Sequence, residues 1–206
     1  MRSSLVGSEM CIRDSLDALF ADLAHPNPHL QTQAYLAMVE HWPNEALPRL
    51  LNLLDQPDVS LRRAAVRGLG AFGAVALKPL ADLFGASADG TVRASCVKAY
   101  AQIASNYPDQ SFSSDAMAVL ETALSDESPV VSQSAVMALG QVGMQALPLL
   151  MAICKGDNIA HVQSAAMALA EIPDPRAVAC LREVFEDPTT DPLSRQMVEA
   201  LSLIHI

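Results

Sequence analysis

The sequence predicts an all-α fold, a right-handed α-solenoid of stacked helical hairpins, from three observations. The 206-residue chain is 51% hydrophobic but only 4% aromatic, which suits closely packed helices better than a β-sandwich. A pattern of apolar and small residues returns about every thirty residues, and a helix-capping residue precedes each copy. Internal repeats of this length predict about five and a half helical hairpins.

Each predicted first helix carries two anchor positions eight residues apart, with a small residue before the second anchor in every copy. The anchor pairs are Leu30/Met38, Leu61/Leu69, Val92/Tyr100, Val131/Leu139, His161/Leu169 and Leu193/Leu201. His161 fits poorly, and we expect Val162 to take its apolar role. Small residues also recur four positions before the second anchor, so each helix presents a narrow seam to its neighbours.

Polar residues predict where these first helices begin. Three residues before the first anchor stand Asn27, Asp58, Asp89, Ser128, Asn158 and Thr190. All six types accept hydrogen bonds from the free backbone N–H groups of a first helical turn. They are therefore predicted N-caps.

Leu-rich segments between these units predict the second helices. They span 45–55, 76–84, 114–124, 146–154 and 174–187. Proline is tolerated in a first helical turn and glycine in the turn after a helix. We therefore expect Pro48, Pro79 and Pro148 near helix starts, and Gly70, Gly73, Gly140 and Gly143 between paired helices.

The two ends of the chain look foreign to this pattern. "SLVGSEMCIRDS" and the final "LSLIHI" resemble translated sequencing-adapter read-through. Residues 1–15 and 202–206 are therefore predicted to be non-native tails, which sets Cys11 and His205 aside. Residues 16–201 form a single predicted repeat domain.

Bulk properties exclude several classes of function. A formal net charge of −10 argues against nucleic acid, which requires a basic surface. No uninterrupted apolar run approaches the roughly 20 residues that span a bilayer, so we expect no membrane partner. Four widely spaced cysteines without a CxxC pair indicate a reduced, cytoplasmic compartment.

The segment "DVSLRRAAVRGLG" (58–70) concentrates arginines in this acidic chain, whereas the matching "SPVVSQSAVMALG" (128–140) has none. Arg62 and Arg93 occupy the same offset in successive units, so they could form a basic ladder for a dicarboxylate. Alternatively, each pairs with the aspartate four residues earlier, Asp58 or Asp89. Arg63 and Arg67 are interpreted as solvated.

The spacing of 39 residues between the third and fourth units places a long connection at 105–114. Tyr107 and Asp109 project from this connection, which makes it a candidate site; a tolerated loop insertion is the alternative. The histidines of "HPNPH" lack the helical spacing of a zinc site, so no metal is expected. The sequence contains no recognisable nucleophile–base arrangement, and catalytic residues stay unassigned.

The repeats resemble HEAT-like repeats of the phycobilin lyase type, whose folds are armadillo-like superhelices. The resemblance covers about 16–201 and is carried by segments such as "HPNPHLQTQAYLAMVE", "DVSLRRAAVRGLGAFG" and "SDESPVVSQSAVMALGQVG". Proteins of that family attach linear tetrapyrroles (phycobilins) to cysteines of phycobiliproteins or remove them, often as paired subunits, and some act as chaperones.

The resemblance implies a phycobilin as substrate rather than a permanently bound cofactor. It implies a phycobiliprotein subunit as partner, with or without a second HEAT-repeat subunit, and C–S bond chemistry if the chain is an enzyme. The candidate ligand-binding residues are Arg62, Arg93, Tyr107 and Asp109. The alternative is a non-enzymatic adaptor, for example one that partners an iron–sulfur assembly factor.

Overall fold

The computed structural model describes residues 15–205, and the side chains of residues 15–201. Over that range the chain is helical with short connections and contains no strand. The helices are α1 (Leu16–Leu23), α2 (Pro28–His41), α3 (Pro43–Asn52), α4 (Val59–Ala71), α5 (Ala74–Ala86), α6 (Gly90–Asn106), α7 (Ser114–Leu124), α8 (Pro129–Val142), α9 (Leu147–Cys154), α10 (Ile159–Ala170), α11 (Pro175–Glu186) and α12 (Pro192–His205). The 3₁₀ turns η1 (Leu53–Asp55) and η2 (Gly143–Ala146) complete the order.

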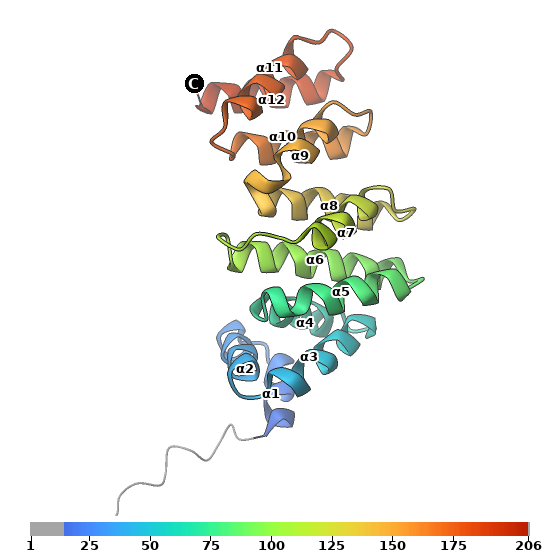
Figure 1. The fold of residues 1–206 in the computed structure, drawn as a ribbon, viewed down its shortest axis with the longest axis vertical. Helices are drawn as coiled ribbons and strands as arrows, with labels where there is room; N and C mark the ends of the chain where they lie inside the picture. The colour runs from blue at the N-terminus through green and yellow to red at the C-terminus, as the bar shows by residue number, and fades with distance from the viewer. Residues whose placement is uncertain (1–14, 206) are drawn as a thin grey trace, which may run out of the picture.

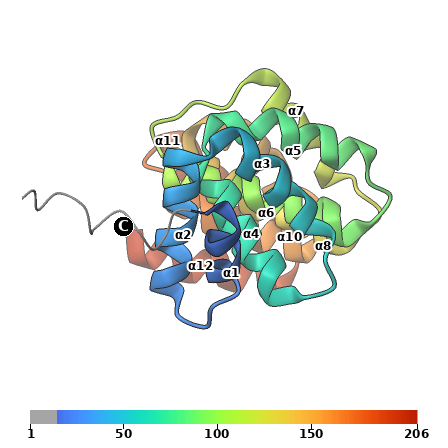
Figure 2. The same cartoon turned by 90° about the horizontal axis from the view of Figure 1, so that it is seen from below.

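The helices stack in chain order along the long axis of the molecule (Figure 1). The even-numbered helices α2 to α12 pack on one another in one layer, and the odd-numbered helices α3 to α11 form the second layer. Viewed from below, α3, α5 and α7 lie toward one side of α4, α6 and α8 (Figure 2). This arrangement confirms the predicted α-solenoid of five hairpins followed by a single first helix.

Helix α1 was not predicted, and it closes the N-terminal end of the stack. Leu19 and Leu23 are buried against the following helices. Asp17 of α1 accepts a hydrogen bond from Arg49 at 2.8 Å. The helix begins at its N-cap Ser15, the last residue of the predicted N-terminal tail. The rest of that tail, with Cys11, lies outside the described residues, as does the side chain of His205.

The predicted caps hold in five of the six units. Asn27, Asp58, Asp89 and Asn158 each accept a backbone N–H of the first turn, whereas Ser128 occupies the N-cap without such a bond.

In the sixth unit the prediction is wrong by one residue. Asp191, rather than Thr190, accepts the N–H of Ser194 at 2.9 Å. Leu193 is consequently 63% exposed, while Ser194 and Val198 are buried.

The seam of small residues confirms the helix-packing prediction. Ala65, Cys96, Ala99, Ala135 and Ala138 are fully buried between first helices. In the fifth unit Val162 is buried and His161 is half-buried, as expected. Short side chains at these positions let neighbouring helices approach closely, which builds the even-numbered layer.

Several turn predictions require correction. Gly73 and Gly143 do adopt positive φ values of 60° and 69° between paired helices, but Gly70 and Gly140 lie inside α4 and α8. Pro148 starts α9. Pro48 and Pro79 lie inside α3 and α5, because those helices begin earlier than the sequence indicated.

The segment Pro129–Cys154 is long enough, and with a mean hydropathy of 1.7 apolar enough, to span a membrane. We had expected no segment of that kind. In the structure Gly143, with its φ of 69°, ends α8, and α9 then packs against α8 and α10. Val131, Leu139 and Leu150 are fully buried. The segment forms the hairpin of one repeat, and a third of its most apolar window is buried.

Candidate functional site

A groove follows α6 between α4 and α8 and is here called the α6 groove. Its wider part encloses about 610 Å³ and its continuation about 350 Å³. The two parts share Val66, Lys98 and Gln102. Gly90 and Ser105 mark its ends on α6, so at 1.5 Å per helical residue the groove is about 22 Å long.

Small side chains on α6 make this groove deep. Gly90, Ala94 and Ser95 line its floor, and the last two are buried. A Cβ atom at Gly90 would lie 3.1 Å from Ser128 Cβ. Because α4 and α8 both pack closely on α6, they rise beside it as two walls.

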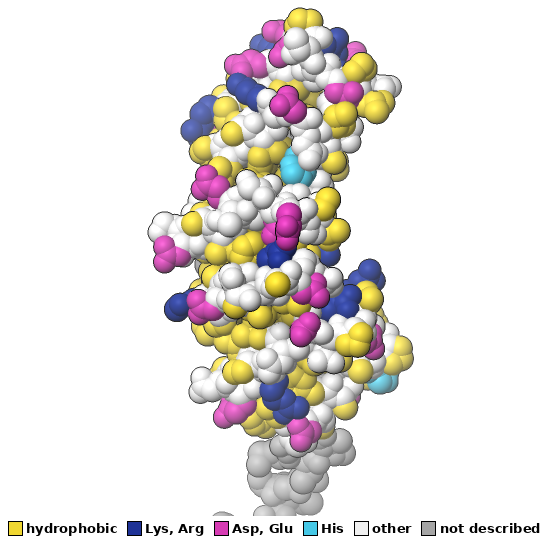
Figure 3. Space-filling view, turned by 90° about the vertical axis from the view of Figure 1, so that its right-hand side faces the viewer, with side chains coloured by type: hydrophobic (Ala, Val, Ile, Leu, Met, Phe, Trp, Pro, Cys, Tyr) yellow, Lys and Arg dark blue, Asp and Glu magenta, His cyan; other side chains and the backbone are white. Residues whose placement is uncertain are grey.

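The groove is basic although the chain as a whole is acidic. Arg62, Arg63, Arg67 and Lys98 line it, and Asp89 is its only acidic residue. In the face shown in Figure 3, several Lys and Arg side chains gather near the right-hand margin, while acidic side chains are scattered. A surface of this kind attracts anions.

Two of these cations are available to a ligand. Among the described residues, neither Arg63 nor Lys98 has a hydrogen bond or ion pair. Arg67 Nη2 donates to the neutral amide oxygen of Gln31 at 2.5 Å, so its charge is not compensated there. Asp89 accepts the N–H of Thr91 at 2.6 Å, and that hydrogen bond lowers the pKa of the carboxyl group.

The predicted arginine residues Arg62 and Arg93 both brace loops. Arg62 Nη1 donates to the carbonyl oxygens of Gln56 and Pro57 at 2.5 and 3.0 Å. Arg93 donates to Ser87 O at 3.1 Å and to both carboxylate oxygens of Asp126 at 2.7 and 2.9 Å.

The Arg93 and Asp126 side chains are only 12% and 8% exposed. Hydrogen bonding to Asp126 raises the pKa of Arg93, and the same bond lowers the pKa of Asp126. Neither Arg62 nor Arg93 forms an ion pair with the aspartate four residues before it, so that part of the structural interpretation was wrong. Of these two arginines, only Arg62 lines the α6 groove.

The long connection at 105–114 is fastened to both neighbouring repeats. Tyr107 Oη donates to Ala71 O at 2.6 Å. Phe112 is buried against Tyr100, and Gln145 hydrogen-bonds both its N–H and its carbonyl group. Asp109 is exposed. Tyr107 follows α6 while Arg93 lies in its first turn, about 20 Å away along the helix. The four predicted residues therefore do not converge on one cavity.

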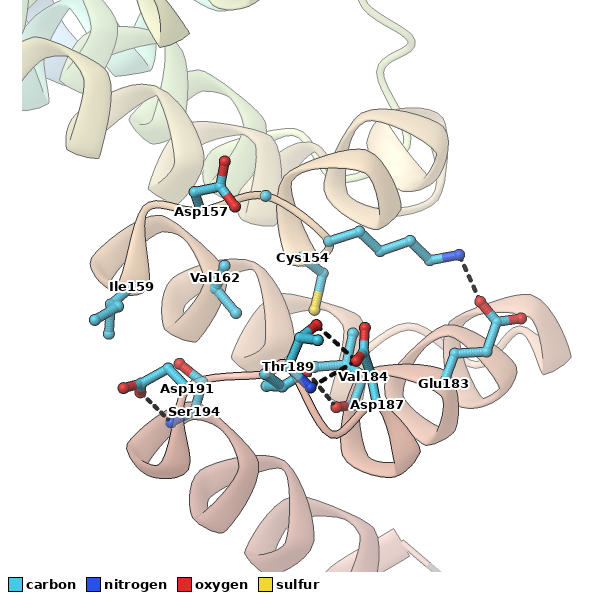
Figure 4. Close-up of a pocket in the computed structure, with 13 residues that line it drawn as sticks. Cys154, Asp157, Ile159, Val162, Glu183, Val184, Asp187, Thr189, Asp191 and Ser194 are labelled. Atoms are coloured by element: carbon cyan, nitrogen blue, oxygen red, sulfur yellow. Dashed lines mark hydrogen bonds and ion pairs between the residues drawn. The ribbon is translucent and has the colours of Figure 1, made fainter.

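A second cavity of about 390 Å³ lies between the loops that precede α10 and α12 (Figure 4). Three of its four carboxylates have partners: Glu183 pairs with Lys155 at 2.5 Å, Asp187 accepts two bonds from Thr189, and Asp191 accepts the N–H of Ser194. The fourth, Asp157, is exposed. Ser194 lines the cavity, and its buried hydroxyl has no partner. Counted from its N-cap Asp191, Ser194 stands at the first anchor position, where the other units carry the larger residues Leu30, Leu61, Val92, Val131 and His161.

Cys154 in the wall of this cavity is close to Cys180 of α11. We had interpreted these two residues as dispersed thiols, but the fold brings them together in the core. The hydrogen bond between the thiols, with burial, raises the pKa of Cys154, and the same bond lowers the pKa of Cys180. Cys180 in turn donates to Met151 O at 3.7 Å. Among residues 15–201 no group of three or more His, Cys, Asp or Glu could hold a metal ion.

Sequence analysis missed Lys98 and regarded Arg63 and Arg67 as merely solvated. A signal was present in the register, because the position two before the second anchor is not buried in any unit. It holds Leu36, Arg67, Lys98, Met137, Met167 and Glu199. Leu36, Met137 and Met167 are each more than half exposed, and this column crosses the groove.

Comparison with known proteins places these features in a family. A HEAT-repeat family model matches residues 16–101 and 115–202, leaving a gap that contains the whole long connection at 105–114. The chain is 45% identical over 173 residues to bilin biosynthesis protein CpeZ of Synechococcus sp. (strain WH8020), covering 81% of this chain and 93% of that protein. It is 35% identical over 183 residues to the uncharacterized phycocyanin operon protein Z of Pseudanabaena tenuis (strain PCC 7409), covering 88% and 91%.

Among solved structures, the X-ray structure of the E. coli protein YIBA superposes with a TM-score of 0.55. The sequences are 16% identical, and the match covers 96% of this chain and 75% of that one. At this identity the likeness concerns the fold alone, and it agrees with the α-solenoid described above.

Proposed function

This chain belongs to the cyanobacterial family of HEAT-repeat, phycobilin lyase-like proteins, and on that premise we propose that it assists the attachment of a linear tetrapyrrole to phycobiliprotein cysteines. The tetrapyrrole is a substrate held in the α6 groove, and the partner is a phycobiliprotein subunit. The observation that carries the proposal is the pair of uncompensated cations, Arg63 and Lys98, in a long groove that also exposes apolar side chains on α8.

The chemistry of the ligand matches this groove. A linear tetrapyrrole is elongated and largely apolar, and it carries two propionate groups. Apolar surface on Val130 and Met137 of α8 suits the rings, whereas the cations suit the carboxylates. Guanidinium groups recognise carboxylates in particular through paired N–H donors.

The reaction requires positioning more than it requires a catalytic residue of this chain. The acceptor protein supplies the thiol, and the tetrapyrrole supplies an electrophilic double bond. Addition forms a C–S bond, consumes the π bond and transfers the thiol proton to the tetrapyrrole. Holding both reactants in one geometry lowers such a barrier by about 7–11 kcal/mol in favourable cases.

The test is an attachment assay with purified components. The chain is mixed with phycocyanobilin and apo-phycocyanin, or with phycoerythrobilin and apo-phycoerythrin, and covalent product is followed as a zinc-fluorescent band. We expect faster or more specific attachment with the wild-type chain and a loss with Lys98→Gln. Lys78→Gln is the matched control, because Lys78 lies on α5 in the other layer and pairs with Asp82.

A chain that changes neither the tetrapyrrole spectrum nor the rate of attachment with either pair would rule out this function. An acceptor that stays soluble without faster attachment would show a chaperone role instead.

A further inference from the structure

The two walls of the α6 groove are built from the same sequence frame with different chemistry. The α4 wall comes from residues 58–70 and the α8 wall from residues 128–140. At matching register positions, Arg62, Arg63 and Arg67 of the first correspond to Ser132, Gln133 and Met137 of the second, of which only Met137 lines the groove. The shared frame fits the packing of both helices on α6, whereas the charged residues occur on the α4 side only.

We infer that the groove binds an amphiphilic dicarboxylate in one orientation, with its acidic groups toward α4 and Lys98 and its apolar edge toward α8. This inference rests on the proposed function for the identity of the ligand, a linear tetrapyrrole. Both propionates of such a molecule project from one edge, from the two central rings. The structure thus assigns orienting roles to Arg63, Arg67 and Lys98 on one side and to Val130 and Met137 on the other.

The positive charges of the α6 groove are concentrated in a small area. Arg63 and Arg67 are four residues apart on α4, so their Cβ atoms lie about 5–6 Å apart on the helix surface. Lys98 projects from the adjacent helix, whose axis lies about 8–10 Å away. Arg62 does not belong to this set, since its Nη1 is bound to backbone carbonyls.

The opposite wall offers no cation to a carboxylate. The α8 residues that line the groove are Ser128, Val130, Ser134, Met137 and Gln141, and none of them is charged. Val130 and Met137 are 57% and 61% exposed. Methionine adapts its shape to a flat apolar partner, whereas a carboxylate placed there would lose water without gaining a charged partner. The reversed orientation is therefore disfavoured.

Binding of biliverdin and of biliverdin dimethyl ester tests this orientation, because the ester has the same rings without the negative charges. Each is titrated into the full chain and followed by absorbance. Exposed charge pairs are each worth up to about fivefold in affinity, so we expect the wild type to prefer the diacid by about tenfold.

Three variants separate the contributions of the two walls. The double variant Arg63→Gln/Lys98→Gln should reduce the preference for the diacid to about twofold or less. Met137→Gln should weaken diacid and ester by the same factor and leave their ratio unchanged. Lys78→Gln is the control for the loss of one charge outside the groove, and circular dichroism confirms that each variant is folded.

Equal affinity of the wild type for diacid and ester would overturn the inference. The inference would also be overturned if Met137→Gln lowered the ratio of diacid affinity to ester affinity, or if the double variant kept the wild-type ratio. The outcome is separable from that of the attachment assay. A chain that shows the predicted ratios without accelerating attachment would refute the proposed function alone, whereas accelerated attachment with an unaltered ratio in the double variant would refute only the orientation.

Discussion

Substituting Gly70 by alanine should destabilise the protein, although the same change stabilises most helices. Gly70 lies in the last turn of α4, where that helix crosses α6. A Cβ atom at this position would lie 2.2 Å from Gln102 Cγ and 2.8 Å from Gln102 Cβ. Since Gln102 Cβ is attached directly to the α6 backbone, a change of rotamer cannot remove the second contact. The two helices would have to move apart.

Two opposing effects determine the size of the change. Alanine is favoured over glycine inside a helix by about 0.8–1.0 kcal/mol. Forcing an extra carbon into a close helix contact costs about 1–3 kcal/mol. A contact of 2.8 Å that no rotamer relieves places the steric cost in the upper part of that range, about 2–3 kcal/mol. We therefore expect a net loss of roughly 1–2 kcal/mol in the free energy of unfolding, equivalent to a decrease in Tm of about 2–8 °C in a domain of this size.

The assay is thermal unfolding followed by circular dichroism, with Gly85→Ala as the matched control. Gly85 lies in α5, and a Cβ atom there would have nothing within 4 Å. This control should raise the Tm slightly. Gly70→Ala should also weaken tetrapyrrole binding, because Gln102 lines the α6 groove. A Gly70→Ala variant as stable as the wild type would refute the close contact between α4 and α6.

Three further predictions test the packing around the groove. The Arg93 guanidinium holds the pKa of Asp126 below its ordinary value of 3.8, so this carboxylate stabilises the folded state above that value and ceases to do so as the pH falls through the lowered pKa. The urea midpoint of the wild type should therefore fall more between about pH 5 and pH 2 than that of Asp126→Asn; parallel decreases would contradict the pairing. Burial raises the pKa of Cys96 to about 12, so its thiol should react with DTNB at neutral pH only after unfolding, in contrast to an accessible thiol. Tyr107→Phe should lower the free energy of unfolding by about 1 kcal/mol, because the Ala71 carbonyl loses its donor. Its tetrapyrrole affinity should stay unchanged. Asp109→Asn should alter neither the stability nor the affinity.

The repeat architecture was predictable because its determinants are local. Caps such as Asp58 and Asp89 act on the next few residues, and anchor pairs such as Val131/Leu139 lie two turns apart on one helix. The single register error came where two capping residues, Thr190 and Asp191, stand side by side. Packing of the last helix on α10 and α11 decided between them.

The candidate site was much less predictable, because its determinants connect different repeats. The sequence left two alternatives for Arg93, a basic ladder with Arg62 or a pair with the N-cap Asp89. The partner of Arg93 in the fold is Asp126, 33 residues later. The interpretation of Gly70 as a turn residue failed for the same reason, since only the approach of α6 shows why a side chain does not fit there.

The amino-acid order alone determined the number of hairpins, their capped starts and the alanine-rich faces, since each depends on residues within about two helical turns. Tertiary structure decided which of these equivalent helices forms the floor of the groove and which cations have no acidic partner. Helix α6 became the floor of a groove because close neighbours flank it on both sides. Arg63 and Lys98 kept their charges available because no acidic side chain of another repeat comes within reach in the described part of the chain. Burial and ion pairing depend on distances through space, and a single sequence does not contain those distances.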